Sequence, residues 1–292
     1  MKKVAEAVAA PASAARKSRD EIRKLALIGA GKLGEGLLSA MLQSQVIPTG
    51  RVECTVAHQP RADYLCGKYG VKAHTDNAQA VKDASLVLIA LKPQQVKAFL
   101  DEVRKALPKD ALIVSAAASV TTSLIERELG YPARVIRAMP NTPCLIRQGM
   151  TALAAGKHAT AHDMEVAQNI FSAMGRTVAV DEKHMDAITA LSASGPAYVY
   201  LIIESLAEAG VKLGVPRDLS TELAAQTLLG ASAMVLLTGE HPAKLKDVVT
   251  TPAGCTIDGL MELEEGRLRV TLIKAVVRAA ARARQLVESN NT

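Results

Sequence analysis

The chain has 292 residues, of which 49% are apolar, and its formal net charge is +6. This length suits two ordinary domains better than one or three. Much of the charge excess lies in residues 2–24, and no basic cluster is interleaved with aromatic residues, which argues against a nucleic-acid partner. No apolar run approaches the roughly 20 residues that a membrane-spanning helix requires, so we expect a soluble protein without a membrane partner.

Residues 1–22 combine alanine with basic residues and lack the continuous apolar core of a secretory signal. We expect a disordered tail there, with an organelle-targeting peptide as the alternative. The four cysteines stand apart without CxxC pairs, and the six histidines show no metal-ligand spacing. We therefore expect no bound metal, no disulfide framework and a cytoplasmic location, where thiols stay reduced.

Residues 23–183 alternate short apolar runs with longer amphipathic ones, as in a parallel sheet wrapped by crossover helices. The predicted strands are Leu25–Ile28, Val52–Ala57, Leu86–Ala90, Leu112–Ala116 and Arg134–Ala138. The predicted helices between them are Leu33–Gln45, Ala62–Lys68, Gln94–Ala106 and Val120–Leu129. Two further strands, near Gly149–Ala155 and Thr177–Val180, flank a helix over Asp163–Met174. The predicted fold class is α/β, a Rossmann-type doubly wound sheet with additions at one edge.

Residues 184–292 show no further strand signal and predict an all-helical domain. The helix over Ala197–Leu213 is apolar on most of its circumference, and Pro216 opens a second helix that runs to Leu237, with Gly239 as its terminator. A helix that is apolar on most sides must be buried on most sides. We therefore expect a homodimer in which this domain packs against its copy in a second subunit, the alternative being a self-contained bundle.

A glycine-rich turn, Gly29-Ala30-Gly31-Lys32-Leu33-Gly34, follows the first strand and opens a helix, as in a dinucleotide-binding fingerprint. Gly29 suits the tight turn, Gly31 leaves room for the pyrophosphate, and Gly34 allows the helix to pack closely on the strand. The amides at the start of the helix favour phosphate groups. The sequence therefore predicts a dinucleotide site at this turn.

The end of the second strand indicates NADPH as the cofactor, with NADH as the alternative. NAD enzymes commonly place an acid there, whereas Glu53 falls inside the strand and the end is Ala57-His58-Gln59-Pro60-Arg61. Arg61 is the best candidate for binding the 2′-phosphate; otherwise it is a solvated residue at the start of a helix. Ligands bind outside the carboxyl ends of such strands, so the ends at Ala90-Leu91-Lys92-Pro93 and Ser115-Ala116-Ala117-Ala118 should also face the cofactor.

Three motifs resemble the pyrroline-5-carboxylate reductase family. They are Met139-Pro140-Asn141-Thr142-Pro143, Leu191-Ser192-Ala193-Ser194-Gly195-Pro196-Ala197-Tyr198, and HPAKLKDVVTTPAGCTIDGL from His241 to Leu260. The similarity spans Leu25 to about Leu286. It implies an oxidoreductase that transfers hydride from NADPH to the C=N bond of the imino acid 1-pyrroline-5-carboxylate and forms L-proline, the last step of proline biosynthesis.

Residue by residue, the resemblance assigns cofactor binding to the turn Gly29, Ala30, Gly31, Lys32, Leu33 and Gly34, and to His58, Gln59, Asn77, Ala90, Leu91, Lys92, Pro93, Ala116, Ala117 and Asn141. It assigns substrate binding to Glu182, Thr250, Thr251, Gly254, Cys255 and Thr256. It also implies a homodimer with interlocked helical domains, often assembled into decamers. The chain departs from the family at Ser119, Ala193 and Ala253, where glycine is usual.

The loop Thr250–Thr256 has the groups that a substrate carboxylate needs, because it carries three hydroxyls and free amides ahead of a helix predicted over Ile257–Leu263. A protonated imine is already electrophilic, so orientation is the main demand on the protein. The residues alone leave Thr256 open between capping that helix and donating a hydrogen bond to the substrate nitrogen. The resemblance favours the second role, which makes Thr256 the predicted catalytic residue.

Two other functions compete with this one. A β-hydroxyacid-dehydrogenase-like oxidoreductase shares the domain order but uses a lysine on the interdomain helix, where this chain has none from Ser194 until Lys212. A non-catalytic nicotinamide-sensing regulator would bind the cofactor without consuming it. Such a regulator is expected to lose the hydroxyl-rich loop, which this chain retains.

Overall fold

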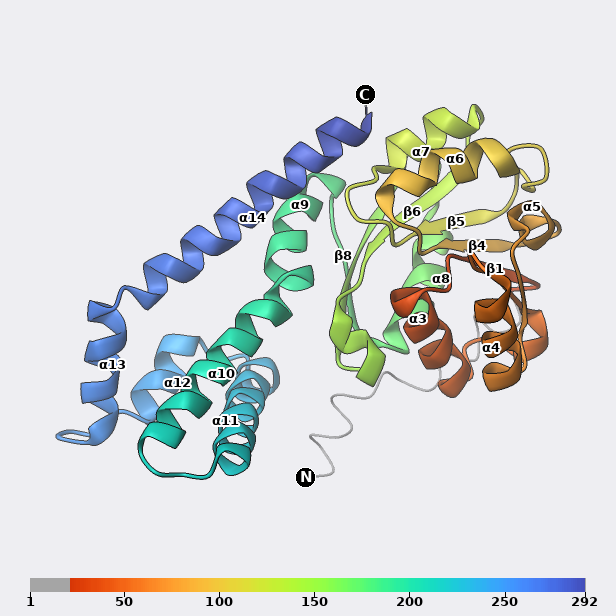
Figure 1. Cartoon of the computed structure of the whole chain (residues 1–292). Helices are drawn as coiled ribbons and strands as arrows, with labels where there is room; N and C mark the ends of the chain where they lie inside the picture. The colour runs from red at the N-terminus through yellow and green to blue at the C-terminus, as the bar shows by residue number, and fades with distance from the viewer. Residues whose placement is uncertain (1–21, 292) are drawn as a thin grey trace. The chain divides into compact units, whose positions relative to one another are not determined.

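The computed structural model describes residues 22–291 and divides into two compact units (Figure 1). One unit contains residues 22–193 together with 279–291, and the other is Ser194–Arg278. The division follows Ala193, whereas the sequence analysis placed it after Lys183, because the short helices in between pack on the sheet through the buried Met185. The tail predicted over 1–22 lies outside the described residues except for Ile22, which is buried in the core of the sheet unit.

The first unit is built on one sheet of eight strands in the order β3-β2-β1-β4-β5-β6-β7-β8. Neighbouring strands run parallel except for β6 and β7, which pair antiparallel. The strands are β1 (Leu25–Ile28), β2 (Val52–Thr55), β3 (Lys72–His74), β4 (Leu86–Ile89), β5 (Leu112–Ser115), β6 (Arg134–Met139), β7 (Gly149–Ala155) and β8 (Gly175–Ala179). The strand order reverses between β1 and β4, as in a doubly wound sheet, so the predicted fold class is confirmed.

Helices cover both faces of this sheet, because parallel strands must be joined by crossover connections (Figure 1). One face packs against α3 (Lys32–Gln43), α4 (Gln59–Tyr69) and α8 (Ala161–Ser172). The other packs against α5 (Asn77–Val81), α6 (Pro93–Val103) and α7 (Thr122–Leu129). Leu25 and Leu27 of β1 face the first layer, and Ala26 and Ile28 face the second. Burial on both faces explains why the central strands are continuous apolar runs.

Four short elements lie between β6 and the second unit, in addition to β7, α8 and β8. They are the 3₁₀ turns η2 (Thr142–Ile146) and η3 (Glu182–His184), the single turn α9 (Met185–Ile188) and the π-helical turn η4 (Thr189–Ala193). These turns, the strand β3 and the helix α5 were not predicted from the sequence. The strand β3 is only three residues long and lacks an apolar run, so pairing with β2 at the sheet edge decides its conformation.

The second unit is helical, as predicted. It contains α10 (Gly195–Lys212), α11 (Arg217–Thr238), α12 (Pro242–Val248), α13 (Cys255–Glu265) and the start of α14 (Leu268–Asn291). Gly239 ends α11 in the left-handed conformation with φ +68°, as its predicted role as terminator requires. Within Ser194–Arg278 the buried residues are Ala207, Ser220 and Ala224. The chain by itself therefore supplies this unit with almost no core.

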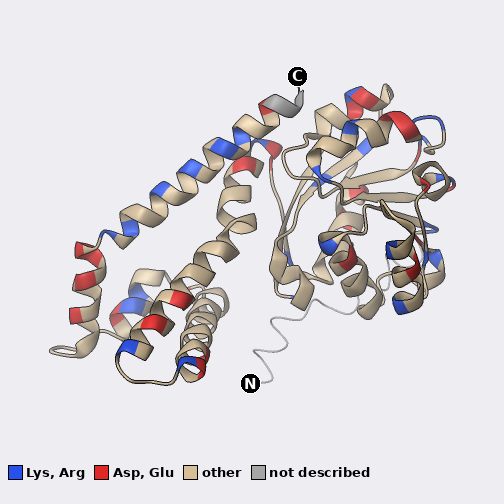
Figure 2. Cartoon of the chain, viewed as in Figure 1, with Lys and Arg blue, Asp and Glu red and all other residues tan. Residues whose placement is uncertain are grey.

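Two helical stretches of the chain, Glu182–Lys212 and Arg217–Thr238, are long and apolar enough to cross a membrane by length and composition alone. This result differs from the expectation drawn from the continuous apolar runs of the sequence. Figure 2 shows that α10 and α11 carry few charged residues along their length. Apolar helices of this kind also occur as buried helices in soluble proteins, so the finding is weak evidence for a membrane.

Candidate active site

The glycine turn is held against the ends of three strands. The amides of Gly29 and Ala30 donate to the carbonyl of Thr55 at 3.1 and 2.8 Å, which joins the turn to the end of β2. Gly29 has φ +87°, and a Cβ there would collide with Leu91 and with the carbonyl of Ala90 beyond β4. A side chain at this position is therefore excluded both by backbone conformation and by space.

The helix α3 leaves its N-terminus open to a ligand. Gly31 is its N-cap, and no side chain caps the helix. A Cβ on Gly31 would meet no atom within 4 Å, so the space above this residue is free for a phosphate group to approach the first amides. At Gly34 a Cβ would clash with the carbonyl of Gly29, which agrees with the close packing expected of the third glycine.

A cleft of about 370 Å³ lies at the carboxyl ends of the strands, beside this turn. Three of the predicted cofactor residues, Gly29, Asn77 and Leu91, line it together. The lining residues that sequence reasoning missed are Thr55, Val56, Thr75, Gln94, Gln95, Ala98, Phe99 and Glu102. The Asn77 amide donates to the Glu102 carboxylate at 2.9 Å, so α5 and α6 are joined across the cleft.

The other predicted cofactor residues sit at the starts of helices and at strand ends. His58 is the exposed N-cap of α4, and the Gln59 amide donates to Asp63 one turn later. Lys92 is the N-cap of α6 and is exposed to solvent. Ala116 and Ala117 follow β5 and are buried. Contacts of these residues with a cofactor stay predictions.

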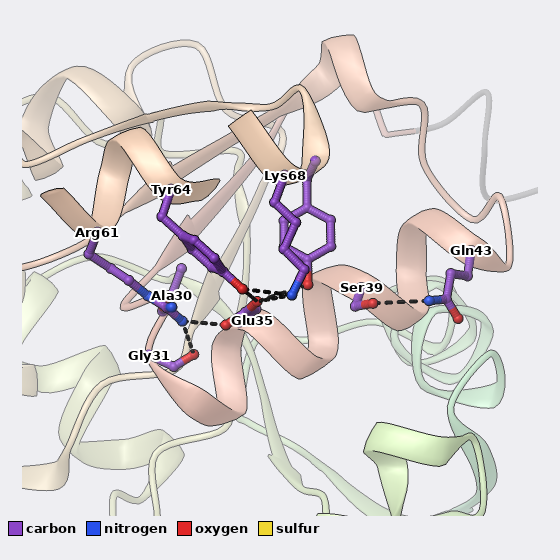
Figure 3. A network of polar contacts seen from close by, with 9 residues as sticks. Ala30, Gly31, Glu35, Ser39, Gln43, Arg61, Tyr64 and Lys68 are labelled. Atoms are coloured by element: carbon purple, nitrogen blue, oxygen red, sulfur yellow. Dashed lines mark hydrogen bonds and ion pairs between the residues drawn. The ribbon is translucent and has the colours of Figure 1, made fainter. Parts of the chain in front are cut away.

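Arg61 lies folded over the glycine turn (Figure 3). Its Nε and Nη2 donate to the carbonyl of Ala30 at 3.4 and 3.3 Å, and Nη2 pairs with Oε2 of Glu35 at 2.5 Å. The guanidinium also packs on the Tyr64 ring, 4.9 Å from its centroid. Three kinds of contact therefore hold this side chain beside the turn, while 34% of it stays exposed in the first turn of α4. Binding of the 2′-phosphate by Arg61 stays a prediction.

The Glu35 carboxylate, which the sequence analysis missed, gathers donors from α4. Burial acts to raise the pKa of this carboxyl, but hydrogen bonds from Lys68, Arg61, Tyr69 and Tyr64 outweigh burial and lower the pKa to about 2. A depressed pKa contributes stability that is present above the unfolded value of 4.5 and is lost as the pH falls toward about 2.

We therefore expect Glu35→Gln to lower the free energy of unfolding at neutral pH. The difference in this free energy between wild type and variant should become smaller as the pH falls below 4.5. Urea unfolding midpoints of the two proteins, measured over a series of pH values, test the prediction. Glu165→Gln is the control, because its carboxylate is 71% exposed on α8. A difference between wild type and Glu35→Gln that does not change with pH would contradict the account.

Two residues predicted to bind ligands are engaged with the protein itself. The Glu182 carboxylate accepts from the amide and hydroxyl of Thr122 at 2.9 and 2.6 Å and pairs with the buried Arg137 at 3.3 Å. The Asn141 side chain accepts from the Met150 amide at 2.9 Å and donates to the Ser192 carbonyl at 3.2 Å. These contacts tie η3 and η4 to the sheet, and the predicted ligand contacts of Glu182 and Asn141 remain untested.

The predicted substrate loop lies in the helical unit, between α12 and α13. Gly254 is the N-cap of α13, and no side chain caps this helix. Thr256 is the second residue of the helix, so the interpretation of Thr256 as its cap is wrong. The hydroxyl of Thr250 donates to the Lys246 carbonyl at 2.9 Å, whereas the hydroxyls of Thr251 and Thr256 have no hydrogen-bond partner within residues 22–291. The loop thus presents free donors at a helix N-terminus.

Two of the three positions where the family usually has glycine, Ser119 and Ala253, adopt a left-handed backbone, each with φ +59°. Such a conformation costs an L-residue about 1 kcal/mol, which glycine avoids. We expect Ala253→Gly to stabilise the helical unit by about 1 kcal/mol. Thermal unfolding measures this, with Ala243→Gly inside α12 as a control that should destabilise instead. A lower unfolding temperature for Ala253→Gly would contradict the expectation.

Family models match both halves of the chain. Residues 182–286 match the pyrroline-5-carboxylate reductase dimerisation model. Residues 24–119 match the model described as NADP oxidoreductase, coenzyme F420-dependent. The two matches correspond to the helical and the sheet part of the fold.

Complete relatives align along nearly the whole chain. The pyrroline-5-carboxylate reductase of Arabidopsis thaliana is 42% identical, over 91% of this chain and 96% of that protein. The Escherichia coli enzyme is 34% identical, over 91% of this chain and 99% of that protein. Because the aligned regions include both units, the likeness is not limited to the common dinucleotide-binding half.

Solved structures agree with these relatives. The pyrroline-5-carboxylate reductase of Coxiella burnetii superposes with a TM-score of 0.84 at 36% identity, over 90% of this chain and 98% of that one. The Plasmodium falciparum pyrroline carboxylate reductase, solved with NADP bound, has a TM-score of 0.82 at 29% identity over the same shares. These relatives and solved structures share the fold and align over both units, so the chain belongs to the pyrroline-5-carboxylate reductase family.

Proposed function

We propose that this chain reduces 1-pyrroline-5-carboxylate to L-proline with NADPH, or with NADH as the alternative reductant. The observation that carries the proposal is the start of α13, where uncapped amides and the free Thr251 and Thr256 hydroxyls form a site for a small carboxylate. A Cβ on Gly254 would collide with the Thr251 hydroxyl, so a larger residue there would displace this hydroxyl from its position beside α13.

The proposed chemistry divides between cofactor and protein. When held at the glycine turn, NADPH would supply the hydride for the imine carbon of the C=N bond. The amides of Cys255 and Thr256 bind the substrate carboxylate. The Thr256 hydroxyl donates a hydrogen bond to the ring nitrogen as hydride addition to the carbon gives this protonated nitrogen a lone pair. The glycine turn and the cleft beside it hold the dinucleotide. Because the protonated imine is electrophilic, positioning is what these residues contribute to the rate.

Turnover tests this proposal directly. Purified protein is mixed with 1-pyrroline-5-carboxylate and NADPH or NADH, and the loss of reduced nicotinamide and the formation of proline are both followed. Absence of turnover with either cofactor would refute the proposed reaction. Cofactor binding without consumption would support the regulator alternative instead. The dehydrogenase alternative is disfavoured because α10 carries no lysine before Lys212, its last residue.

Arg61 is proposed to bind the 2′-phosphate of NADPH. We expect Arg61→Ala to lower kcat/KM for NADPH about 30-fold and to change kcat/KM for NADH less than about threefold. The reason is that one charge-assisted contact is lost, and only NADPH has the phosphate that makes it. Steady-state kinetics with both cofactors measure this ratio. Arg104→Ala, which changes an exposed arginine near the end of α6, is the control. Equal losses with the two cofactors would remove Arg61 from the phosphate site.

We also propose that the helical units of two subunits form a homodimer, and that dimers assemble further into a decamer. The support is the match to a dimerisation model over residues 182–286 and the exposure of large apolar side chains along α10 and α11. A cavity of about 610 Å³ bounded by Ile257, Met261 and Leu272 of α13 and α14 offers a further apolar surface. A partner helix packed on these surfaces would remove their apolar side chains from water. We propose the cytoplasm as the location of the protein.

A further inference from the structure

The carboxylate of Glu35 is the centre of a polar network between α3 and α4 (Figure 3). Its Oε2 pairs with Arg61 at 2.5 Å. Its Oε1 accepts from Lys68 at 3.0 Å, from Tyr64 at 3.1 Å and from Tyr69 at 2.9 Å. The side chain is 17% exposed, and four donors from one helix surround it. Glu35 is therefore a fixed negative charge rather than a mobile surface acid.

This charge lies next to the group proposed to bind the cofactor phosphate. Glu35 stands in the first turn of α3, directly after Gly34. Its partner Arg61 is bound by the same Nη2 to the carbonyls of Ala30 and Gly31. The Nη1 of Arg61 has no hydrogen-bond partner in the part of the chain that the structure describes. Arg61 can therefore meet an anion through Nη1 while its other edge stays bound to Glu35 and the turn.

The local charges are unequal, and their balance decides how strongly an anion is attracted. Arg61 and Lys68 contribute two positive charges, and Glu35 contributes one negative charge. The low pKa of Glu35, about 2, means that this carboxylate stays ionised at neutral pH. An incoming phosphate is attracted by the two cations but repelled by the carboxylate that lies between them. NADH lacks the 2′-phosphate and meets little of this repulsion.

We propose that Glu35 is a specificity-determining residue, whose carboxylate offsets the charge of Arg61 at the glycine turn and so limits the preference for NADPH over NADH. The proposal rests on the proposed nicotinamide-dependent function, and it concerns cofactor binding alone. Glu35 acts through charge, whereas a residue that merely held Arg61 in place would act through hydrogen bonding.

The decisive variant is Glu35→Gln, which removes the charge, keeps the shape of the side chain and keeps one of its two acceptor oxygens. We expect NADPH to bind about fivefold more tightly, the size expected for one unit charge in a partly solvated and salt-screened site, and NADH to change less than about twofold. The nicotinamide fluorescence of each reduced cofactor measures its binding. Glu165→Gln removes the same charge from an exposed position on α8 and should leave both affinities unchanged.

Combining Glu35→Gln with Arg61→Ala distinguishes an effect of the Glu35 charge on the phosphate from a role in positioning Arg61. If Glu35 acts by charge, Glu35→Gln should tighten NADPH binding in the Arg61→Ala protein as well. Weaker NADPH binding by Glu35→Gln, with no effect in the Arg61→Ala background, would show that Glu35 only positions Arg61 and would overturn the proposal. Equal changes for NADPH and NADH would overturn it too. Glu35→Ser tests the same charge if thermal unfolding shows that Glu35→Gln is not folded.

These titrations contain no imine substrate, so they remain informative if the protein fails to reduce 1-pyrroline-5-carboxylate. In that case the proposed reaction is refuted, while tighter NADPH binding by Glu35→Gln would still support the role of its charge. The opposite result is turnover by the wild type together with an unchanged NADPH affinity in Glu35→Gln. It would support the proposed reaction and refute the proposed role of Glu35.

Discussion

Thr256→Ala is expected to lower kcat about 100-fold while leaving the dissociation constant of NADPH within about twofold of wild type. The hydroxyl of Thr256 has no hydrogen-bond partner within the described residues, and it projects from the first turn of α13, where a carboxylate ligand would bind. Removing it takes away the proposed donor to the ring nitrogen and leaves the glycine turn of the other unit untouched. Stopped-flow or steady-state kinetics, together with a separate cofactor titration, measure the two quantities.

Thr256→Ser is the matched control for this prediction, because serine keeps the hydroxyl and loses only a methyl group. It should retain most of the activity. An Ala variant that loses cofactor affinity in proportion to its rate would assign Thr256 to the cofactor site instead. An Ala variant with wild-type kcat would leave the α13 N-terminus without a catalytic side chain.

Leu229→Asp is expected to prevent dimer formation and to abolish most of the activity. Leu229 lies in the middle of α11 and is 60% exposed in the single chain, in a unit that has almost no core of its own. If a partner subunit covers this face, the variant places an uncompensated charge in the interface, at a cost of roughly 3 to 5 kcal/mol. That cost weakens the dimer by about 100-fold or more. Light scattering coupled to size-exclusion chromatography measures the mass of the particle.

Ile146→Asp introduces the same charge at an exposed apolar residue outside the helical unit. Ile146 is 73% exposed in η2, and the variant should assemble and react as the wild type does. A Leu229→Asp protein that keeps the wild-type mass and activity would show that α11 does not form the interface. The same outcome would leave the exposed apolar helices of this unit without an explanation.

The sheet was predictable because its information is local. The strands β1 and β7 begin and end at the predicted residues, since apolar runs buried on both faces stand out from the turns around them. The strand β3 was not predictable, because Lys72-Ala73-His74 has no apolar run and becomes a strand only by pairing with β2. The helix α5 is a single short segment capped by Asp76, below the length at which periodicity indicates a helix.

The candidate site shows the same contrast. The glycine turn was predicted because its residues are consecutive, and each glycine meets the strand or the space that its position implies. The partners of Glu35 lie 26 to 34 residues away along the chain, so no local pattern could connect them. For Glu182 and Asn141 the sequence indicated proximity to ligands, while the structure gives their side chains partners in Thr122, Arg137, Met150 and Ser192.

The sequence by itself determined the alternation of strands and helices, the dinucleotide turn and the family motifs, because each of these depends on neighbouring residues and on the repeat of apolar positions. Only the tertiary structure decided which charges neutralise one another and that Thr256 follows the cap of α13 instead of forming it. It also decided that the helical unit leaves its apolar faces uncovered within one chain. Pairing, capping and burial depend on distances between segments, and these distances are set by packing.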